Sequence, residues 1–402
     1  MFHTFIPIKC HIQHYPWGGR ARGGVRPYIA ELTGMEAEEG EPFAELWIGA
    51  HPKLPALAML DGEKIPLDKL IAVNQRAILG DRVLAAGFDS LPFLLKILDC
   101  DQPLSIQAHP DLNRAAELHA RDPEHYPDAN HKPEIAIGIT GMTAFCQFRP
   151  AADISADIDR LPALKSFLGD AGANERTGGK DWLRALYGRL FSASDAEVAA
   201  TLAELEKAVS VAVPRNSADE WFTRLAEFYP GDRGLLSAFF LNVVDIGAEE
   251  GVFLGPNEPH AYLKGTIVEC MASSDNVVRA GLTPKFIDRE ALVEMITCEM
   301  GRPKVNQGET LAAGEKVYKV PVPEFQVEVY THGAGVSRGY ASDGAVSILL
   351  VLDGEAVLRC PEGEYTAPRG SAWLWPAELD AAAIDYVGDT TKIIRARPNV
   401  ID

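Results

Sequence analysis

The alternation of apolar and polar positions divides the chain into three stretches. From residue 1 to 150, short apolar runs such as Phe93–Leu98 and Ile135–Ile139 are broken by Gly, Pro, Asp and Asn. This is typical of β-strands joined by turns. The same punctuation returns at Gly251–Leu254 and continues to the end of the chain. The pattern therefore predicts a mainly β protein with a middle stretch of different character.

The middle stretch, from 151 to about 240, has the periodicity of helices. Apolar residues recur at helical spacing at Val198, Leu202, Leu205 and Val209. Two pairs have the S-x-x-E spacing of a helix-starting capping box, Ser194 with Glu197 and Ser217 with Glu220. We expect a helical insert here, with an internal loop at Gly178-Gly179.

The last stretch, 311–402, contains a turn signal but few candidate metal-binding residues. The apolar run Ser347–Leu352, the pair Asp353-Gly354 and the run Ala356–Leu358 predict a β-hairpin. No histidine follows His332. We therefore expect a metal-free β domain, with Trp373 and Trp375 packed inside it.

Composition limits the classes of protein and of partner. The chain has 402 residues, of which 47% are hydrophobic and 24% charged, as in a globular protein of two or three domains. A net charge of −19 argues against nucleic acid and anionic membranes as partners. No apolar run approaches the roughly 20 residues of a membrane span, and the N-terminus lacks a signal-peptide pattern. Six cysteines without a CxxC pair suit a reduced, cytoplasmic setting.

The candidate chemistry starts at Gln107 and His109, which follow an apolar run that we interpret as a strand. Side chains two residues apart on a strand point to the same face. With Glu134 and His260 they would give two imidazoles, a carboxylate and an amide, a set that suits a catalytic cation with an open position. Any one of these residues alone is more often a hydrogen-bonded structural residue.

Segments in the same order resemble type I mannose-6-phosphate isomerase, a zinc enzyme with the cupin fold. They cover about 1–150 and 235–290 densely, and the ordered set is specific although each piece is weak. The matching segments are Tyr15–Gly18, Glu45–Pro52, Leu91–Leu98, Ser105–Pro110, His131–Glu134, Cys146–Arg149, Gly255–Tyr262 and Val268–Lys285.

The resemblance implies a fold of cupin (jelly-roll) barrels with an inserted α-helical domain. We expect a catalytic domain formed by 1–150 and 239–310, a helical insert at 151–238, and a C-terminal metal-free β domain at 311–402. It also implies one Zn²⁺ per chain, bound by Gln107, His109, Glu134 and His260. The implied reaction interconverts mannose 6-phosphate and fructose 6-phosphate through an enediolate, in a cytoplasmic monomer that serves GDP-mannose biosynthesis.

Other residues in these segments receive expected roles. Arg279 would stabilise the enediolate, and Lys132 is a site residue that we name first among the proton-transferring candidates. Glu269, Asp275 and His131 remain alternatives to Lys132. Further substrate contacts are expected from Ser105, Lys96 and Lys285 on the phosphate, from Tyr262, and from Trp17 as an apolar wall. Glu45 and His51 are expected to support the structure.

The sequence leaves two other functions open. A cupin iron(II) oxygenase also uses two histidines and a carboxylate, but Gln-x-His replaces its usual His-x-His pair here. A non-catalytic sugar-binding cupin would have lost a metal ligand or Arg279. The sequence retains all of them, which favours the isomerase acting on a small phosphorylated sugar.

Overall fold

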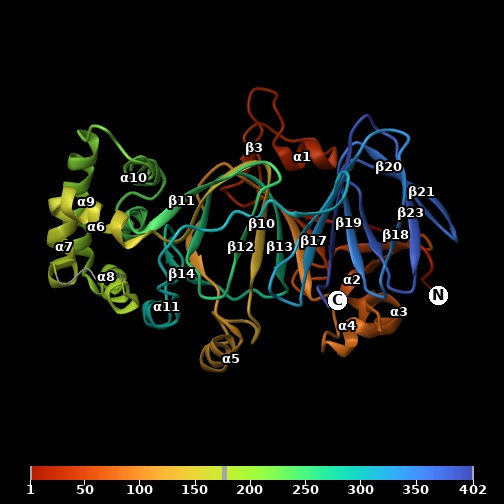
Figure 1. Ribbon diagram of the computed structural model, residues 1–402, viewed down its shortest axis with the longest axis horizontal. Helices are drawn as coiled ribbons and strands as arrows, with labels where there is room; N and C mark the ends of the chain where they lie inside the picture. The colour runs from red at the N-terminus through yellow and green to blue at the C-terminus, as the bar shows by residue number, and fades with distance from the viewer. Residues whose placement is uncertain (1, 174–178, 401–402) are drawn as a thin grey trace.

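The computed structural model describes residues 2–173 and 179–400. Figure 1 shows a group of helices at one end, strands in the centre and a second group of strands at the other end. The predicted mainly β fold with a helical insert is confirmed. Gly178, in the predicted internal loop, lies outside the described residues.

The central strands come from both sides of the helical insert. Their main path runs β11-β10-β13-β8-β5-β2, β12 pairs with β10, and β9 pairs with both β13 and β14. All of these pairs are antiparallel. The insert therefore interrupts one sheet, as predicted, and the exact domain boundaries stay a prediction. The bounds are β2 (His11–Gln13), β5 (Glu45–Gly49), β8 (Phe93–Cys100), β9 (Ile106–Ala108), β10 (Glu134–Phe148), β11 (Leu241–Ile246), β12 (Gly251–Leu254), β13 (His260–Ala272) and β14 (Val278–Gly281).

A second sheet combines the two ends of the chain. Its order is β15-β16-β17-β24-β19-β22-β1-β6-β7, so three strands from the first 66 residues extend the C-terminal sheet. A smaller sheet, β18-β23-β20-β21, completes this end of the molecule. The bounds are β1 (Ile6–Lys9), β6 (Leu57–Leu60), β7 (Glu63–Pro66), β15 (Glu309–Ala312), β16 (Glu315–Tyr318), β17 (Gln326–His332), β18 (Ser337–Ala341), β19 (Ser347–Asp353), β20 (Glu355–Cys360), β21 (Gly363–Pro368), β22 (Ala372–Trp375), β23 (Ala381–Tyr386) and β24 (Thr391–Arg397).

The Asp353-Gly354 turn does not close the predicted hairpin. β19 pairs with β22 and β24, whereas β20 pairs with β21 and β23. Gly354 has a φ of +69°, and a Cβ there would lie 2.4 Å from the carbonyl oxygen of Thr390. The turn takes the chain from one sheet to the other, so this prediction is wrong. Trp373 and Trp375 are buried, as expected.

The insert consists of five α-helices and a 3₁₀ helix within the described residues. The capping box at Ser194 and Glu197 is confirmed. The second box is displaced by one residue, because Asn216 and Asp219 form it and Ser217 is already helical. The bounds are α6 (Ala151–Arg160), α7 (Pro162–Ala173), α8 (Lys180–Ser192), α9 (Asp195–Ser210), α10 (Ser217–Phe228) and η1 (Arg233–Phe239).

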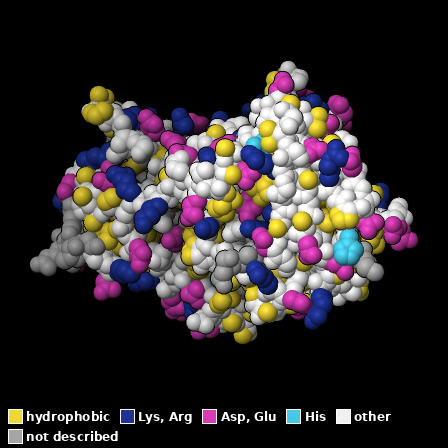
Figure 2. Space-filling model, turned by 45° about the vertical axis from the view of Figure 1, so that its right-hand side comes forward, with side chains coloured by type: hydrophobic (Ala, Val, Ile, Leu, Met, Phe, Trp, Pro, Cys, Tyr) yellow, Lys and Arg dark blue, Asp and Glu magenta, His cyan; other side chains and the backbone are white. Residues whose placement is uncertain are grey.

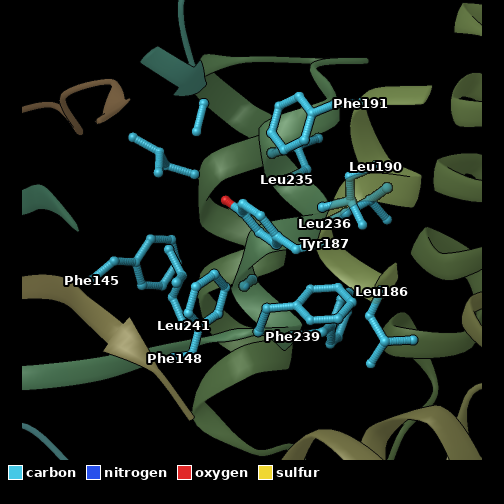
Figure 3. Close-up of a cluster of buried hydrophobic side chains, with 14 of the residues drawn as sticks. Phe145, Phe148, Leu186, Tyr187, Leu190, Phe191, Leu235, Leu236, Phe239 and Leu241 are labelled. Carbon is cyan, nitrogen blue, oxygen red and sulfur yellow. The ribbon is translucent and has the colours of Figure 1, made fainter. Parts of the chain in front are cut away.

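Aromatic side chains join the insert to the central sheet. Phe148 of β10 packs edge-on against Tyr187 of α8, with ring centroids 4.9 Å apart. The Tyr187 hydroxyl lies 3.1 Å from Oγ of Ser237, in the middle of the apolar cluster drawn in Figure 3. Because this cluster includes strand, helix and 3₁₀ residues, the insert shares a continuous core with the sheet.

Short helices cover the sheets, and the sequence pattern did not predict those within residues 1–150. None of the helices in the described ranges is long and apolar enough to cross a membrane. The remaining bounds are β3 (Gly19–Arg20), β4 (Pro42–Phe43), α1 (Tyr28–Thr33), α2 (Leu67–Val73), α3 (Gln75–Leu79), α4 (Asp81–Ala85), α5 (Leu112–Arg121) and α11 (Arg289–Met295).

Candidate metal centre and cavity

Three buried side chains converge on one point of the central sheet. Nε2 of His109 lies 3.2 Å from Oε1 of Glu134, and Nε2 of His260 lies 3.5 Å from Oε2 of the same carboxylate. The three potential ligand atoms lie within 4.8 Å of one another. Glu134 and His260 are the first residues of β10 and β13, and His109 directly follows β9.

Gln107 joins this group through the strand ladder. Its Cα is the antiparallel partner of His260 in the β9–β13 pair, and its Nε2 lies 3.5 Å from Nε2 of His260. The four predicted ligands are therefore together in space. Rotation of the Gln107 amide would present its oxygen in place of its nitrogen, because the two ends have nearly the same shape.

Backbone carbonyls fix the orientation of both imidazoles. Nδ1 of His109 lies 2.7 Å from the carbonyl oxygen of Asn276, and Nδ1 of His260 lies 2.9 Å from that of Glu258. A proton on each Nδ1 leaves the Nε2 lone pairs directed at Glu134. This second hydrogen bond is the usual device for orienting a metal-binding histidine.

The protonation states suit a cation. Burial, reinforced by Lys132, lowers the pKa of His109 to about 4, so its imidazole is neutral at pH 7. Burial opposes ionisation of Glu134, but Lys132 and His109 outweigh it and hold the pKa of this carboxyl well below its usual range. Nε2 of His109 is buried and makes no hydrogen bond. Two imidazole nitrogens, a carboxylate and an amide match the ligand chemistry of zinc.

Asp128 organises the loop that carries the Asn276 carbonyl, and sequence patterns gave no signal for it. Its carboxylate accepts hydrogen bonds from Oγ of Ser274, the backbone N–H of Asp275 and Nδ2 of Asn276. The Asn276 amide also donates to the carbonyl oxygens of Asp128 and Asn130. This network holds the partner of His109 in place.

A cavity of about 520 Å³ opens in front of Gln107. Its walls include ten residues that the sequence analysis assigned to the site. They are Trp17, Lys96, Ser105, Gln107, Lys132, Tyr262, Glu269, Asp275, Arg279 and Lys285. Lys53 and Tyr229 also line it and were not predicted, because a lone lysine or tyrosine outside a pattern carries no signal.

Three cations of the cavity have no acidic partner within the described part of the chain: Lys53, Arg279 and Lys285. Burial lowers the pKa of Arg279, and burial together with Arg279 and Lys53 lowers that of Lys285. On the face shown in Figure 2, acidic and basic side chains are interspersed. The three cations act on one another at the cavity wall, and salt screens them from distant carboxylates, so a locally positive wall can coexist with a net charge of −19.

Lys96 differs from these cations because two carboxylates surround it. Its Nζ lies 3.1 Å from Glu269 and 3.6 Å from Glu45, and 5.2 Å from the ring centroid of Trp47. Burial alone would lower the pKa of Lys96, but Glu269 and Glu45 raise it above its usual range. Burial also raises the pKa of the Glu269 carboxyl, with Lys96 opposing it. The positive charge of Lys96 is therefore already balanced by the carboxylates of Glu45 and Glu269.

Lys132 and Tyr262 contact Glu134 from the side of the cavity. Nζ of Lys132 lies 2.6 Å from Oε1, and the Tyr262 hydroxyl donates to Oε2 over 3.4 Å. His131 points elsewhere: its Nε2 lies 2.7 Å from Glu324, and it is not part of the cavity wall.

Asp275 and Trp17 complete the description of the predicted wall. A carboxylate oxygen of Asp275 lies 3.7 Å from Nε2 of buried His51. The Trp17 ring stacks on Tyr15 with centroids 6.0 Å apart, so the two rings form an aromatic wall at one side of the cavity. Ser105 also lines the cavity, one residue before β9.

Two family models match the chain. Residues 5–151 match the catalytic domain of type I phosphomannose isomerase, and residues 164–241 match its helical insertion domain. Together they span more than half of the chain.

Curated relatives and solved structures agree with these models. The mannose-6-phosphate isomerase of Homo sapiens is 37% identical over 390 residues, covering 90% of each chain. Mannose-6-phosphate isomerase 2 of Arabidopsis thaliana is 32% identical over 411 residues, covering 97% of this chain and 92% of that one. A point mutant of phosphomannose isomerase from Salmonella typhimurium is 30% identical, with a TM-score of 0.88 over 98% of this chain and 99% of that one. A zinc-bound mannose 6-phosphate isomerase aligns with a TM-score of 0.87 at 30% identity and the same coverage.

The likeness therefore extends through both β regions and the insert, and the cupin architecture expected from the sequence is confirmed. The chain belongs to the type I phosphomannose isomerase family.

Proposed function

We propose that this chain is a zinc-dependent isomerase that interconverts D-mannose 6-phosphate and D-fructose 6-phosphate. The observation that carries this proposal is the buried group of His109, Glu134 and His260 behind a cavity with unpaired cations. The relatives named for this activity and the zinc-bound structural neighbour support it.

Gln107, His109, Glu134 and His260 would hold one zinc ion per chain. When bound, zinc acts as a Lewis acid that polarises carbonyl and hydroxyl oxygens of the sugar. The buried Nε2 of His109, which makes no hydrogen bond, supports this ligand set.

We assign the phosphate to the wall formed by Lys53 and Lys285, with the hydroxyl of Ser105 as a further donor. The two lysines are unpaired among the described residues, and ammonium groups bind a phosphate dianion strongly. Lys96 is the weaker candidate because Glu45 and Glu269 already neutralise it.

Arg279 is suited to the enediolate. Its Cα is the ladder partner of Gln107 in the β9–β14 pair, so it enters the cavity next to the proposed metal ligands. The ion pairs with Asp275 or Glu269 that would give it a purely structural role do not form. A fixed guanidinium stabilises negative charge that develops in the transition state without reorganising at that moment.

The reaction moves a hydrogen from C2 to C1 and a proton from the C2 hydroxyl to the C1 oxygen. Lys132, Glu269 and Asp275 line the cavity and are the candidate proton carriers. His131 is removed from this set by its bond to Glu324. We propose Lys132 as the group to test first, because its ammonium lies against the ligand Glu134.

The other functions have no support from the site. A cupin that only binds sugar would have lost a metal ligand or Arg279. Here the proposed metal ligands lie together and Arg279 lines the cavity beside them. No observation favours an oxygenase.

We further propose that the protein is a monomer, that it acts in the cytoplasm and that it serves GDP-mannose biosynthesis.

A substrate panel tests the proposal. The purified zinc-loaded protein is given mannose 6-phosphate, glucose 6-phosphate or unphosphorylated mannose, and ketose formation is followed with a coupled assay. We expect fructose 6-phosphate from mannose 6-phosphate and a much lower kcat/KM for mannose, since it lacks the phosphate. Equal rates on both would remove the phosphate-binding part of the proposal, and no ketose from any sugar would reject it.

A further inference from the structure

The helical insert contributes Tyr229 to the cavity wall. Tyr229 is the first of four residues, Tyr229–Asp232, which we call the insert loop. The loop joins α10 to η1. At one end the Tyr229 hydroxyl donates to the carbonyl oxygen of Pro103 over 2.7 Å. Pro103 leads into the wall that holds Ser105 and Gln107.

At its other end the insert loop holds a second segment of the cavity wall. Leu282–Lys285, which we call the rim segment, lines the cavity and carries Lys285. Oδ1 of Asp232 accepts a hydrogen bond from the N–H of Leu282 over 2.9 Å, and Oδ2 accepts one from Thr283 over 3.2 Å. Asp232 itself does not line the cavity.

These bonds account for most of the backbone donors in the rim segment. Pro284 has no N–H, and the N–H of Lys285 donates to Oγ1 of Thr283 over 3.1 Å. Two of the three available donors therefore depend on one carboxylate. Because a hydrogen bond to a charged acceptor is stronger than one between neutral groups, Asp232 is the main constraint on this backbone.

Two glycines make this contact close. A Cβ on Gly281 would lie 2.5 Å from Cα of Gly234, and a Cβ on Gly234 would lie 2.7 Å from the nitrogen of Leu282. The backbone of η1 thus touches the end of β14 directly. The insert is in turn anchored to β10 by the aromatic cluster around Tyr187 (Figure 3).

We propose that Asp232 is a positioning residue that sets the place of Lys285 and thereby the affinity of the cavity for phosphate. This inference rests on the proposed function, in which the rim segment contacts the phosphate group. Through Asp232 the helical insert would influence the affinity for substrate, although the insert contains none of the proposed metal ligands.

The test compares Asp232→Ala and Asp232→Asn with Ser194→Ala. Ser194 caps α9 in the same insert and is absent from the cavity wall, so Ser194→Ala is the control for general weakening of the insert. The measurements are KM and kcat for mannose 6-phosphate, the dissociation constant of inorganic phosphate by calorimetry, zinc content and Tm.

We expect Asp232→Ala to raise KM and the phosphate dissociation constant about tenfold, because the rim segment loses both of its hydrogen bonds to the Asp232 carboxylate and part of the affinity that depends on its order. Zinc content should not change, and kcat should change less than about threefold, because the ordered rim acts on binding. Asp232→Asn retains one acceptor oxygen. Its KM and phosphate dissociation constant should therefore lie between those of the wild-type protein and those of Asp232→Ala. Ser194→Ala should lower Tm without changing either constant.

Unchanged KM and phosphate affinity in both Asp232 variants would overturn the inference. If Asp232→Ala does not fold, Asp232→Asn decides by the same measurements. If the wild-type protein lacks isomerase activity, the proposed function fails, whereas the phosphate dissociation constants still test the role of Asp232.

Discussion

The guanidinium of Arg279 is half-buried at the wall of the cavity and has no acidic partner in the described ranges. Keeping such a charge unpaired costs free energy, which the protein recovers when an anion forms beside it. This distinguishes it from Lys96, which lies between Glu45 and Glu269. We therefore expect the two cations to respond differently to substitution.

Arg279→Ala should lower kcat about two to three orders of magnitude, as the loss of an oxyanion donor does. Arg279→Lys should recover little, because an ammonium cannot bridge two oxygens as a guanidinium does. Steady-state kinetics with zinc content measured in parallel checks this. Lys285→Ala is the matched control and should mainly raise KM. A rise in KM with unchanged kcat for Arg279→Ala would show that Arg279 only binds the phosphate.

His109→Ala should abolish retention of zinc during dialysis, since it removes a buried ligand whose tautomer is fixed by Asn276. His131→Ala is the matched control, because it is also buried but is bound to Glu324. Metal analysis of both variants decides. Equal zinc content in the two would contradict the proposed ligand set.

Sequence reasoning selected most of the residues that the structure brings together in this candidate site, because they fall in short specific segments. Strand parity related Gln107 to His109, and ordered motifs located Glu134, His260 and Arg279. The sequence patterns did not predict Lys53, Asp128 or Asp232. Their roles depend on which loops meet in three dimensions, and a single lysine or aspartate has no pattern of its own.

At the scale of elements, local signals succeeded where a helix is defined by its own residues. The box at Ser194 and Glu197 was found directly. At α10 two overlapping capping choices exist, and the structure uses Asn216 with Asp219. The Asp353-Gly354 turn was found, but its strands pair elsewhere. Pairing depends on long-range contacts that a turn cannot specify.

The start of α10 can be tested by two neighbouring substitutions. Asn216→Ala should lower the free energy of unfolding by about 1 kcal/mol, because it removes the acceptor for the N–H of Asp219. Ser217→Ala, already inside the helix, should change it by less than about 0.5 kcal/mol. Urea unfolding of both variants measures this. The reverse order would place the cap at Ser217.

At the scale of the whole molecule, the two ends of the chain depend on each other. β1 lies between β22 and β6, with Ile6 opposite Leu374. The sequence indicated a C-terminal β region but not that strands from the N-terminus complete its sheet. His131 and Glu324 add a buried contact between residues of the first and last parts of the chain.

A fragment of residues 311–402 should therefore fail to unfold cooperatively on its own, because the edge of β22 and the apolar side chains that β1 covers become exposed. Coexpression with residues 2–90, which carry β1, β6 and β7, should restore a cooperative transition. Thermal unfolding followed by circular dichroism checks both. A cooperative transition of the fragment alone would contradict this dependence.

One metal ion held by Gln107, His109, Glu134 and His260 would make this cavity the active site of an isomerase. The most direct measurement is a zinc titration of the metal-free protein, with fructose 6-phosphate formation from mannose 6-phosphate recorded at each step. We predict no activity without metal and a linear rise that stops at about one zinc per chain. Full activity in the metal-free protein, or no activity with one zinc bound, would show that this metal ion does not make the protein an isomerase.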